Sequence, residues 1–177
     1  MPDRRARFEQ VVLPHMDAAY NLARWLTRND QDARDVVQDS MLRAFRFFDG
    51  LRGDARPWLL ALVRNACMSW LKANRPVEVA GYDAGAAEAR LADPETPETL
   101  ALRAVDRRML NEALSALPAH FREALILREL EELSYRDIAR ITDAPVGTVM
   151  SRLSRARRLL AESLRAISRA SAPKVHE

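Results

Sequence analysis

One predicted helix carries a polar face whose residue types suit contact with nucleic acid. Its members lie three and four positions apart, the spacing that places side chains on one side of a helix: Thr148, Ser151, Arg152 and Arg155. An arginine guanidinium makes two parallel hydrogen bonds to a phosphate or to the edge of a guanine. Arg157 and Arg158 continue the positive charge. The alternative is a merely solvated basic face, and the surrounding elements decide between the two.

The opposite face of the same helix is apolar and predicts contact with a core: Val149, Leu153, Ala156, Leu160 and Leu164. A shorter helix precedes it, in which Ser134 is a predicted N-cap and Asp137 completes a capping box. Residues 142–145 predict a turn, and Pro145 suits a helix start because its missing N–H needs no partner there. This helix-turn-helix pattern places its second helix in the major groove of DNA, so we favour DNA binding.

Helical periodicity extends over most of the 177 residues, and five glycines leave little room for a sheet protein. The other predicted helices span residues 7–26, 31–48, 57–73, 100–117 and 119–130. Pro14 should kink or break the first of them. Their predicted apolar faces include Phe8, Val12, Met16, Tyr20, Leu26, Val36, Val37, Met41, Phe45, Phe48, Phe121, Leu125, Ile126 and Leu130.

The predicted fold is all-α, with two small helical domains joined by an acidic linker. Three helices make the N-terminal domain (5–76), and four make the C-terminal domain (101–168), which contains the helix-turn-helix. The linker (77–100) holds prolines, glycines and six acids against Arg90 alone, a composition typical of a segment without stable structure. A short helix at 84–91 is an alternative within it. The tail from about Ser168 should fray.

Residue types that would support catalysis are sparse. Cys67 is the only cysteine and falls within a helical pattern, which predicts a small buried side chain. No zinc site can be assembled from it and the scattered histidines, His15, His120 and His176. An acidic cluster without a histidine partner predicts a solvated helix end: Glu129, Glu131 and Glu132. We therefore expect no enzymatic activity, no metal, no cofactor and no small-molecule substrate.

Charge and hydropathy suggest the compartment. The net charge is +3, and arginine supplies nearly all the positive charge because Lys72 and Lys174 are the only lysines. The polar N-terminus, MPDRRARFEQ, predicts no signal peptide. No apolar run approaches the roughly 20 residues that cross a bilayer. We expect a cytoplasmic protein without membrane insertion.

The order and spacing of these elements resemble the extracytoplasmic-function (ECF) sigma factors, the small two-domain sigma subunits of bacterial RNA polymerase. The resemblance is carried by residues 32–71 of the N-terminal domain and by residues 117–139 and 145–160 of the C-terminal domain. It implies that 5–76 is sigma region 2 and 101–168 is sigma region 4. The implied partners are core RNA polymerase, promoter DNA and an anti-sigma factor. The competing hypothesis is a stand-alone helix-turn-helix regulator, which would need no polymerase.

The resemblance assigns a polymerase contact to the helix over 31–48. Acids early in a helix are also explained by its dipole, so the pattern alone leaves docking as an alternative. The family docks this helix on the clamp coiled coil of the largest polymerase subunit, which implies contacts from Asp35, Gln38, Asp39, Leu42 and Arg43.

The helix over 57–73 and its preceding loop should read the promoter −10 element. Asn65 falls on the asparagine that holds a flipped base in the family. The implied backbone contacts are Arg56, Arg64 and Lys72. Trp58 and Trp70 could stack on bases, but their spacing favours core packing. Ser69 and residues 73–75 depart from the family pattern and leave the exact −10 preference open.

The helix from Val146 should read the −35 element, through Thr148, Met150, Ser151, Arg152, Arg155 and Arg158. Met150 stands where the family often has a basic residue. Methionine cannot donate a hydrogen bond, so a shifted −35 preference is expected.

The −10 and −35 promoter elements lie two helical turns apart, about 70 Å. A linker of about 24 residues reaches roughly 80 Å when stretched but averages about 27 Å as a coil, so the polymerase must hold it extended.

Overall fold

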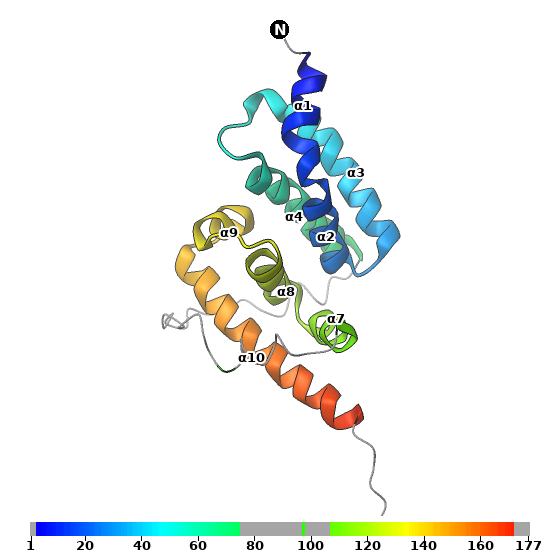
Figure 1. The fold of residues 1–177 in the computed structure, drawn as a ribbon, viewed down its shortest axis with the longest axis vertical. Coiled ribbons are helices and arrows are strands. Elements are labelled where there is room, and N and C mark those ends of the chain that lie inside the picture. Colours follow the sequence, from blue (N-terminus) through cyan, green and yellow to red (C-terminus); the bar gives the residue numbers. More distant parts are fainter. Residues whose placement is uncertain (1–2, 75–96, 98–106, 172–177) are drawn as a thin grey trace, which may run out of the picture.

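The computed structural model describes residues 3–74, 97 and 107–171, and these residues form helices and short turns without a strand (Figure 1). The N-terminal helices are α1 (Arg4–Val12), α2 (Met16–Thr27), α3 (Asp30–Phe47) and α4 (Ala55–Asn74), with 3-10 turns at Leu13–His15 and Phe48–Gly50. The C-terminal helices are α7 (Arg107–Ala116), α8 (Ala119–Leu125), α9 (Tyr135–Thr142) and α10 (Val146–Ser171). The all-α prediction is confirmed. Apart from residue 97, the linker predicted over 77–100 and the helix proposed at 84–91 lie outside the described residues.

The N-terminal helices form a bundle in which α2 packs against both α3 and α4. The first predicted helix is present as α1 and α2, broken at Pro14, because proline lacks the amide hydrogen that a continuous helix requires. Asn29 caps α3 by accepting hydrogen bonds from the amides of Gln31 and Asp32, at 2.8 and 3.0 Å. The core between the helices is fully buried at Leu22, Leu26, Leu59, Leu60, Val63, Cys67 and Leu71.

Two residues that were predicted to lie in the core of this bundle are partly exposed to solvent. Met16 is 39% exposed because it directly follows the break between α1 and α2. Phe45 is 37% exposed, although its ring makes a T-shaped contact with the ring of Phe8, at 5.2 Å between centroids. Trp58 and Trp70 pack against the core, as their spacing predicted.

The helix-turn-helix is formed by α9 and α10. Ser134 caps α9: its hydroxyl oxygen accepts from the Asp137 amide at 3.1 Å and its hydroxyl donates to the Asp137 carboxylate at 2.9 Å. The chain leaves α9 through Asp143 at a φ of 51°, and the Ala144 amide donates back to the Ala139 carbonyl at 3.0 Å. All five predicted apolar residues of α10 are buried. The helix continues to Ser171, three residues beyond the predicted start of fraying.

A wide π turn at Ile126–Leu130 follows α8 and corrects the predicted helix face. This turn takes up more residues than an α-helical turn, so it shifts the angular register of the residues after it. Leu130, a predicted core residue, is 49% exposed, and Glu131 is only 6% exposed. The turn therefore places Glu131, and not Leu130, at the buried side of the chain.

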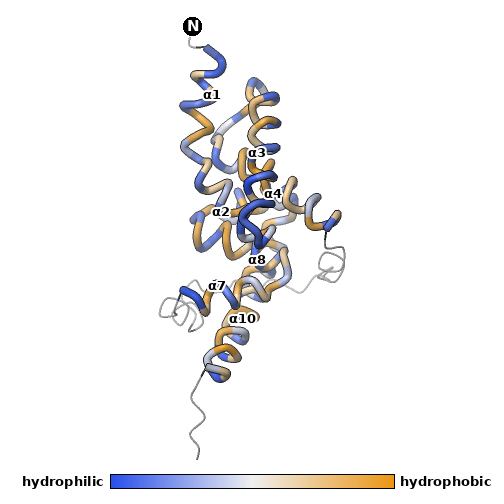
Figure 2. The backbone as a smooth tube through the Cα atoms, turned by 90° about the vertical axis from the view of Figure 1, so that its right-hand side faces the viewer, coloured by the Kyte–Doolittle hydropathy of each residue, from blue (hydrophilic) through white to orange (hydrophobic). Residues whose placement is uncertain are grey.

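The N-terminal and C-terminal helices are in contact. Helix α4 lies against α9, and α2 lies against α8, while α1 and the end of α10 point to opposite ends of the molecule (Figure 1). Hydrophobic and hydrophilic residues alternate along α10 (Figure 2). We call the contact surface of α2 and α4 with α8, α9 and the π turn the seam.

Candidate nucleic-acid interface

Helix α10 presents a polar face near its N-terminus. At about 100° of rotation per residue, four of the predicted −35 residues fall within an arc of roughly 100°: Thr148, Ser151, Arg152 and Arg155. All four are partly exposed, and Arg158 is exposed one turn further on. Ser151 donates to the Thr148 carbonyl at 3.1 Å, which leaves its oxygen free to accept. The arrangement offers guanidinium and hydroxyl groups on one side of a helix that starts after a tight turn.

Met150 does not share this face. It lies about 160° around the helix from Arg152 and is partly buried. Arg157 has a structural contact instead of continuing the basic surface. Its side chain is only 10% exposed, and its Nη2 lies 2.7 Å from Glu129 Oε1. The polar face of α10 is thus narrower than the run of arginines in the sequence suggests.

Helix α4 divides the predicted −10 residues between two faces. Asn65 and Lys72 are exposed on one side of the helix. Arg56 and Arg64 point into the seam, where each meets a carboxylate of the C-terminal helices. The structure therefore leaves two of the four candidates accessible and holds the other two in ion pairs.

The Arg64 pair lies at the centre of the seam. Arg64 Nε is 2.8 Å from Glu123 Oε2 and its Nη2 is 3.0 Å from Glu123 Oε1, a bidentate contact. The Glu123 side chain is 0% exposed and that of Arg64 is 12% exposed. Complete burial would by itself raise the pKa of Glu123. The hydrogen bonds from His120 and Arg64, together with the Arg64 charge, outweigh burial and hold that pKa below its ordinary value.

Acid should weaken the seam. A carboxylate whose pKa is lowered on folding contributes stability above its unfolded pKa, about 4.3 for glutamate, and loses it as the pH falls further. We expect the free energy of unfolding to fall below about pH 4.3, and Glu123→Gln to flatten that fall relative to an exposed-site control, Glu112→Gln. Urea unfolding followed by circular dichroism between pH 3 and pH 7 measures this. The same pH dependence in both variants would contradict a stabilising charge on Glu123.

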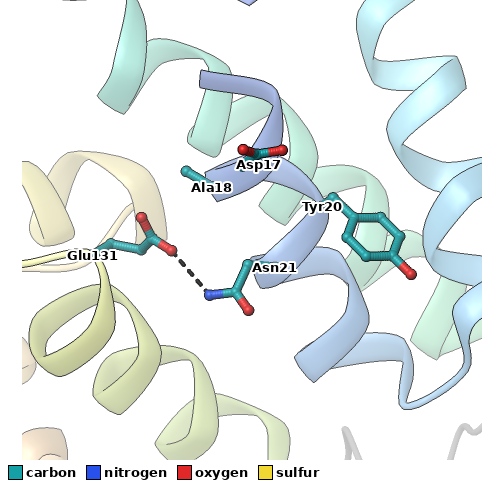
Figure 3. A pocket seen from close by; sticks show the side chains of 5 residues that line it. All are labelled: Asp17, Ala18, Tyr20, Asn21 and Glu131. Atoms are coloured by element: carbon teal, nitrogen blue, oxygen red, sulfur yellow. Dashed lines mark hydrogen bonds between the residues drawn. The ribbon is translucent and has the colours of Figure 1, made fainter. Parts of the chain in front are cut away.

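A second pair closes the edge of the seam. Arg56 Nη2 is 2.7 Å from Glu131 Oε2, and Asn21 Nδ2 donates to Glu131 Oε1 at 3.0 Å (Figure 3). The Glu131 side chain is 8% exposed. An open pocket of about 490 Å³ lies beside it, lined by Asp17, Ala18, Tyr20, Asn21 and Glu131. The prediction of a solvated acidic helix end is therefore wrong for Glu131, because the π turn directs it inward.

Two further arginines tie the seam through backbone carbonyls. Arg28 Nη1 donates to the Ser115 carbonyl at 2.6 Å. Arg122, which is 0% exposed, donates to the carbonyls of Trp25 and Leu117 at 3.0 and 2.9 Å. Sequence reasoning missed the seam residues on the C-terminal side. The available signal was the pair of charges at 122 and 123 inside the apolar stretch from Phe121 to Leu127.

Cys67 is fully buried on the same face of α4 as Arg64, three residues further along the helix. Burial, reinforced by the nearby Glu123 carboxylate, raises the pKa of the Cys67 thiol to about 12. The thiol is therefore protonated and inert in this arrangement, as the sequence predicted.

The outer face of α3 is open. The five predicted polymerase contacts are all exposed or partly exposed: Asp35, Gln38, Asp39, Leu42 and Arg43. Leu42 is the most exposed large apolar side chain described, at 66%. Helix α3 packs on α2 and α4 and lies on the side away from α9 and α10 (Figure 1). This face combines acids with an uncovered leucine and is not part of the seam.

Within the described residues there is no group of three or more histidine, cysteine or acidic side chains arranged to hold a metal ion. None of the described helices combines the length and the apolarity needed to cross a membrane.

Comparison with known families matches both halves of the chain. Residues 11–77 match the model of sigma-70 region 2, and residues 107–160 match the model of sigma-70 region 4. The ECF RNA polymerase sigma-E factor of Haemophilus influenzae is 38% identical over 150 residues, which cover 78% of this chain and 77% of that protein. The RNA polymerase sigma-H factor of Pseudomonas aeruginosa is 35% identical over 175 residues, covering 94% of this chain and 90% of that protein.

Solved structures share the fold. The sigma factor RpoE of Bartonella quintana, crystallised with the anti-sigma factor NepR, superposes with a TM-score of 0.69 at 28% identity. The alignment covers 90% of this chain and 97% of that one. CnrH, solved with the cytosolic domain of CnrY, superposes with a TM-score of 0.63 at 24% identity, a likeness of fold alone.

Proposed function

Because this chain belongs to the ECF sigma factors of the sigma-70 family, we propose a division of labour among three of its helices. The protein is a sigma factor that directs promoter-specific transcription, and its partners are core RNA polymerase and promoter DNA. In our proposal α3 docks on the polymerase, α4 reads the −10 element, and α10 reads the −35 element.

One observation carries the docking assignment: the exposed face of α3, on which the acids Asp35 and Asp39 lie beside the uncovered Leu42. Exposed leucines surrounded by polar groups are typical of protein interfaces. A free-standing regulator that needed only DNA would have no use for such a face opposite its helix-turn-helix. The acids Asp35 and Asp39 would complement a basic surface on the polymerase.

The DNA contacts follow from the exposed polar faces. Arg152 and Arg155 lie in the first turns of α10, where a helix-turn-helix meets base edges. Thr148, at the helix start, is placed to contact a phosphate. On α4, the exposed Asn65 carries an amide that can hydrogen-bond the edge of an unstacked base, and Lys72 shares its side of the helix. Met150 lies off the α10 face, so we expect it to contribute only an apolar contact.

We assign the chain no reaction of its own. The phosphodiester bonds would be made by the polymerase, and the sigma subunit would contribute binding and orientation. The Bartonella relative was crystallised with an anti-sigma factor, which supports an anti-sigma factor as a third partner of this chain.

Run-off transcription tests the proposed function. Purified bacterial core polymerase would transcribe fragmented genomic DNA with and without this protein. We expect discrete new transcripts that require both components, whose aligned start sites would give the −10 and −35 preferences. The absence of such transcripts, together with tight binding of the free protein to a symmetric DNA site, would instead support a stand-alone regulator.

A further inference from the structure

We infer that Arg157 and Glu129 are positioning residues for −35 recognition, because their ion pair fixes the rotation of α10 and with it the direction in which Arg155 points. The inference rests on the proposed function, in which α10 reads the −35 element. It deepens that function by adding two residues that act on DNA only through the orientation of the polar face of α10. Neither residue has to touch DNA itself.

Arg157 lies on the side of α10 that is opposite the polar face. At 100° of rotation per residue it points about 160° away from Arg155, and the two residues are about 3 Å apart along the helix axis. The Arg157 side chain is only 10% exposed, whereas Arg155 is partly open to solvent. A contact at Arg157 therefore acts on α10 at the level of Arg155 and from the opposite side.

Two nitrogens of the Arg157 guanidinium converge on one carboxylate oxygen. Nη2 lies 2.7 Å and Nε lies 3.3 Å from Glu129 Oε1. Charge-assisted hydrogen bonds from a planar guanidinium are strong and directional, so they resist rotation and sliding of the helix that carries it. Within the part of the chain that the structure describes, this is the only ion pair that α10 makes.

The apolar face of α10 supplies burial without the same directional constraint. That face is buried, and the helix packs on α7, α8 and α9. The hydrophobic effect depends on the area removed from water and has no preferred direction. A rotation of about 10° moves a group some 6 Å from the helix axis by roughly 1 Å, although a binding site must hold its groups within about 0.5 Å. The ion pair supplies the constraint that such precision requires.

The π turn after α8 brings Glu129 to α10. Its neighbour in the turn, Arg128, contacts the other helix of the helix-turn-helix: the guanidinium carbon lies 4.6 Å from the centre of the Tyr135 ring in α9. Arg128 Nη1 also donates to the Leu133 carbonyl at 2.8 Å, just before that helix. Such π turns are rare and occur frequently at functional sites. Here two consecutive side chains of one turn hold both α9 and α10.

Binding of holoenzyme to two DNA fragments tests the inference. One fragment carries a promoter mapped by run-off transcription, and the other carries the same promoter with a scrambled −35 element. The ratio of the two affinities measures −35 recognition, and the affinity for the scrambled fragment measures the remaining binding. The test variants are Glu129→Ala, Arg157→Gln and the double substitution. The control, Glu162→Ala, removes the same charge as Glu129→Ala from an exposed position on α10.

We expect each single substitution to lower the ratio about tenfold, which is within the worth of one bidentate contact to a base pair. Removing the acid at Glu129 makes the protein more positive, so electrostatic attraction alone would strengthen binding to both fragments. A loss confined to the intact promoter therefore cannot come from charge. The double substitution should also lose only about tenfold, because effects that act through one pair do not add. The control should keep the wild-type ratio.

Glu129→Ala also protects the test against misfolding, because the Glu129 side chain is 42% exposed. Circular dichroism checks that each variant keeps its helices. A wild-type ratio in Glu129→Ala, or a loss of about a hundredfold in the double substitution, would overturn the inference. A wild-type holoenzyme that binds the two fragments alike would instead refute the −35 assignment of α10, so the two failures are distinguishable.

Discussion

Asp39→Arg is expected to abolish promoter-directed transcription by preventing docking on core polymerase. Asp39 lies near the centre of the exposed α3 face, between Asp35 and Leu42. Reversing its charge would replace an attraction to a basic partner surface with a repulsion, at a cost of at least about 2 kcal/mol. That corresponds to roughly a thirtyfold weaker Kd. Titration of labelled sigma with core polymerase measures the affinity, and run-off transcription measures the consequence.

The control for this prediction is Glu112→Arg, which makes the same charge reversal at an exposed position on α7. It should bind polymerase like the wild type. Asp39→Arg should keep the helical content of the free protein, because Asp39 is exposed on α3. Wild-type polymerase affinity in Asp39→Arg would refute the assignment of the α3 face.

Arg155→Ala is expected to leave polymerase affinity unchanged and to weaken holoenzyme binding at −35-dependent promoters by about 1–3 kcal/mol, the worth of a bidentate contact to a base pair. The resulting loss is between roughly fivefold and 150-fold in promoter affinity. Filter binding of holoenzyme to a promoter fragment measures it, with a parallel fragment whose −35 element is scrambled. On the scrambled fragment the variant and the wild type should bind alike.

The matched control for Arg155→Ala is Arg165→Ala. Arg165 is an exposed arginine on the same helix, almost three turns further from its N-terminus. Its removal lowers the net charge equally but should change promoter affinity little. Equal losses from the two substitutions would show that α10 binds DNA through its overall charge, and the −35 face would then be placed incorrectly.

The two substitutions together separate docking from DNA recognition. Asp39→Arg should prevent the protein from binding the polymerase, the step that precedes promoter binding. Arg155→Ala should allow that step and weaken promoter binding itself. Neither residue contributes to the ion pairs of the seam, so both experiments are independent of that contact. The two experiments would test the α3 face and the α10 face separately, and neither substitution removes a contact of the seam.

The sequence by itself determined the elements and most of their faces. Several features depend only on neighbours within a few positions, so local spacing predicted them. They are the turn between α9 and α10, the Ser134 cap, the break at Pro14 and the five buried residues of α10. The exposure of the α3 face was predictable for the same reason. The family resemblance added roles to residues that the periodicity had already placed on a surface.

Only the tertiary structure decided what the second face of α4 touches. The Arg64–Glu123 pair joins residues 59 positions apart, and the Arg56–Glu131 pair joins residues 75 positions apart across the linker. No local pattern encodes such a pairing, because it depends on how two helical bundles dock. The π turn after α8 added a change of register that a regular helical period cannot predict, and this change directed Glu131 inward and Leu130 outward. Arginines that read as free DNA ligands in the sequence are therefore ion-paired in the fold, because burial favours pairing each charge with an opposite one.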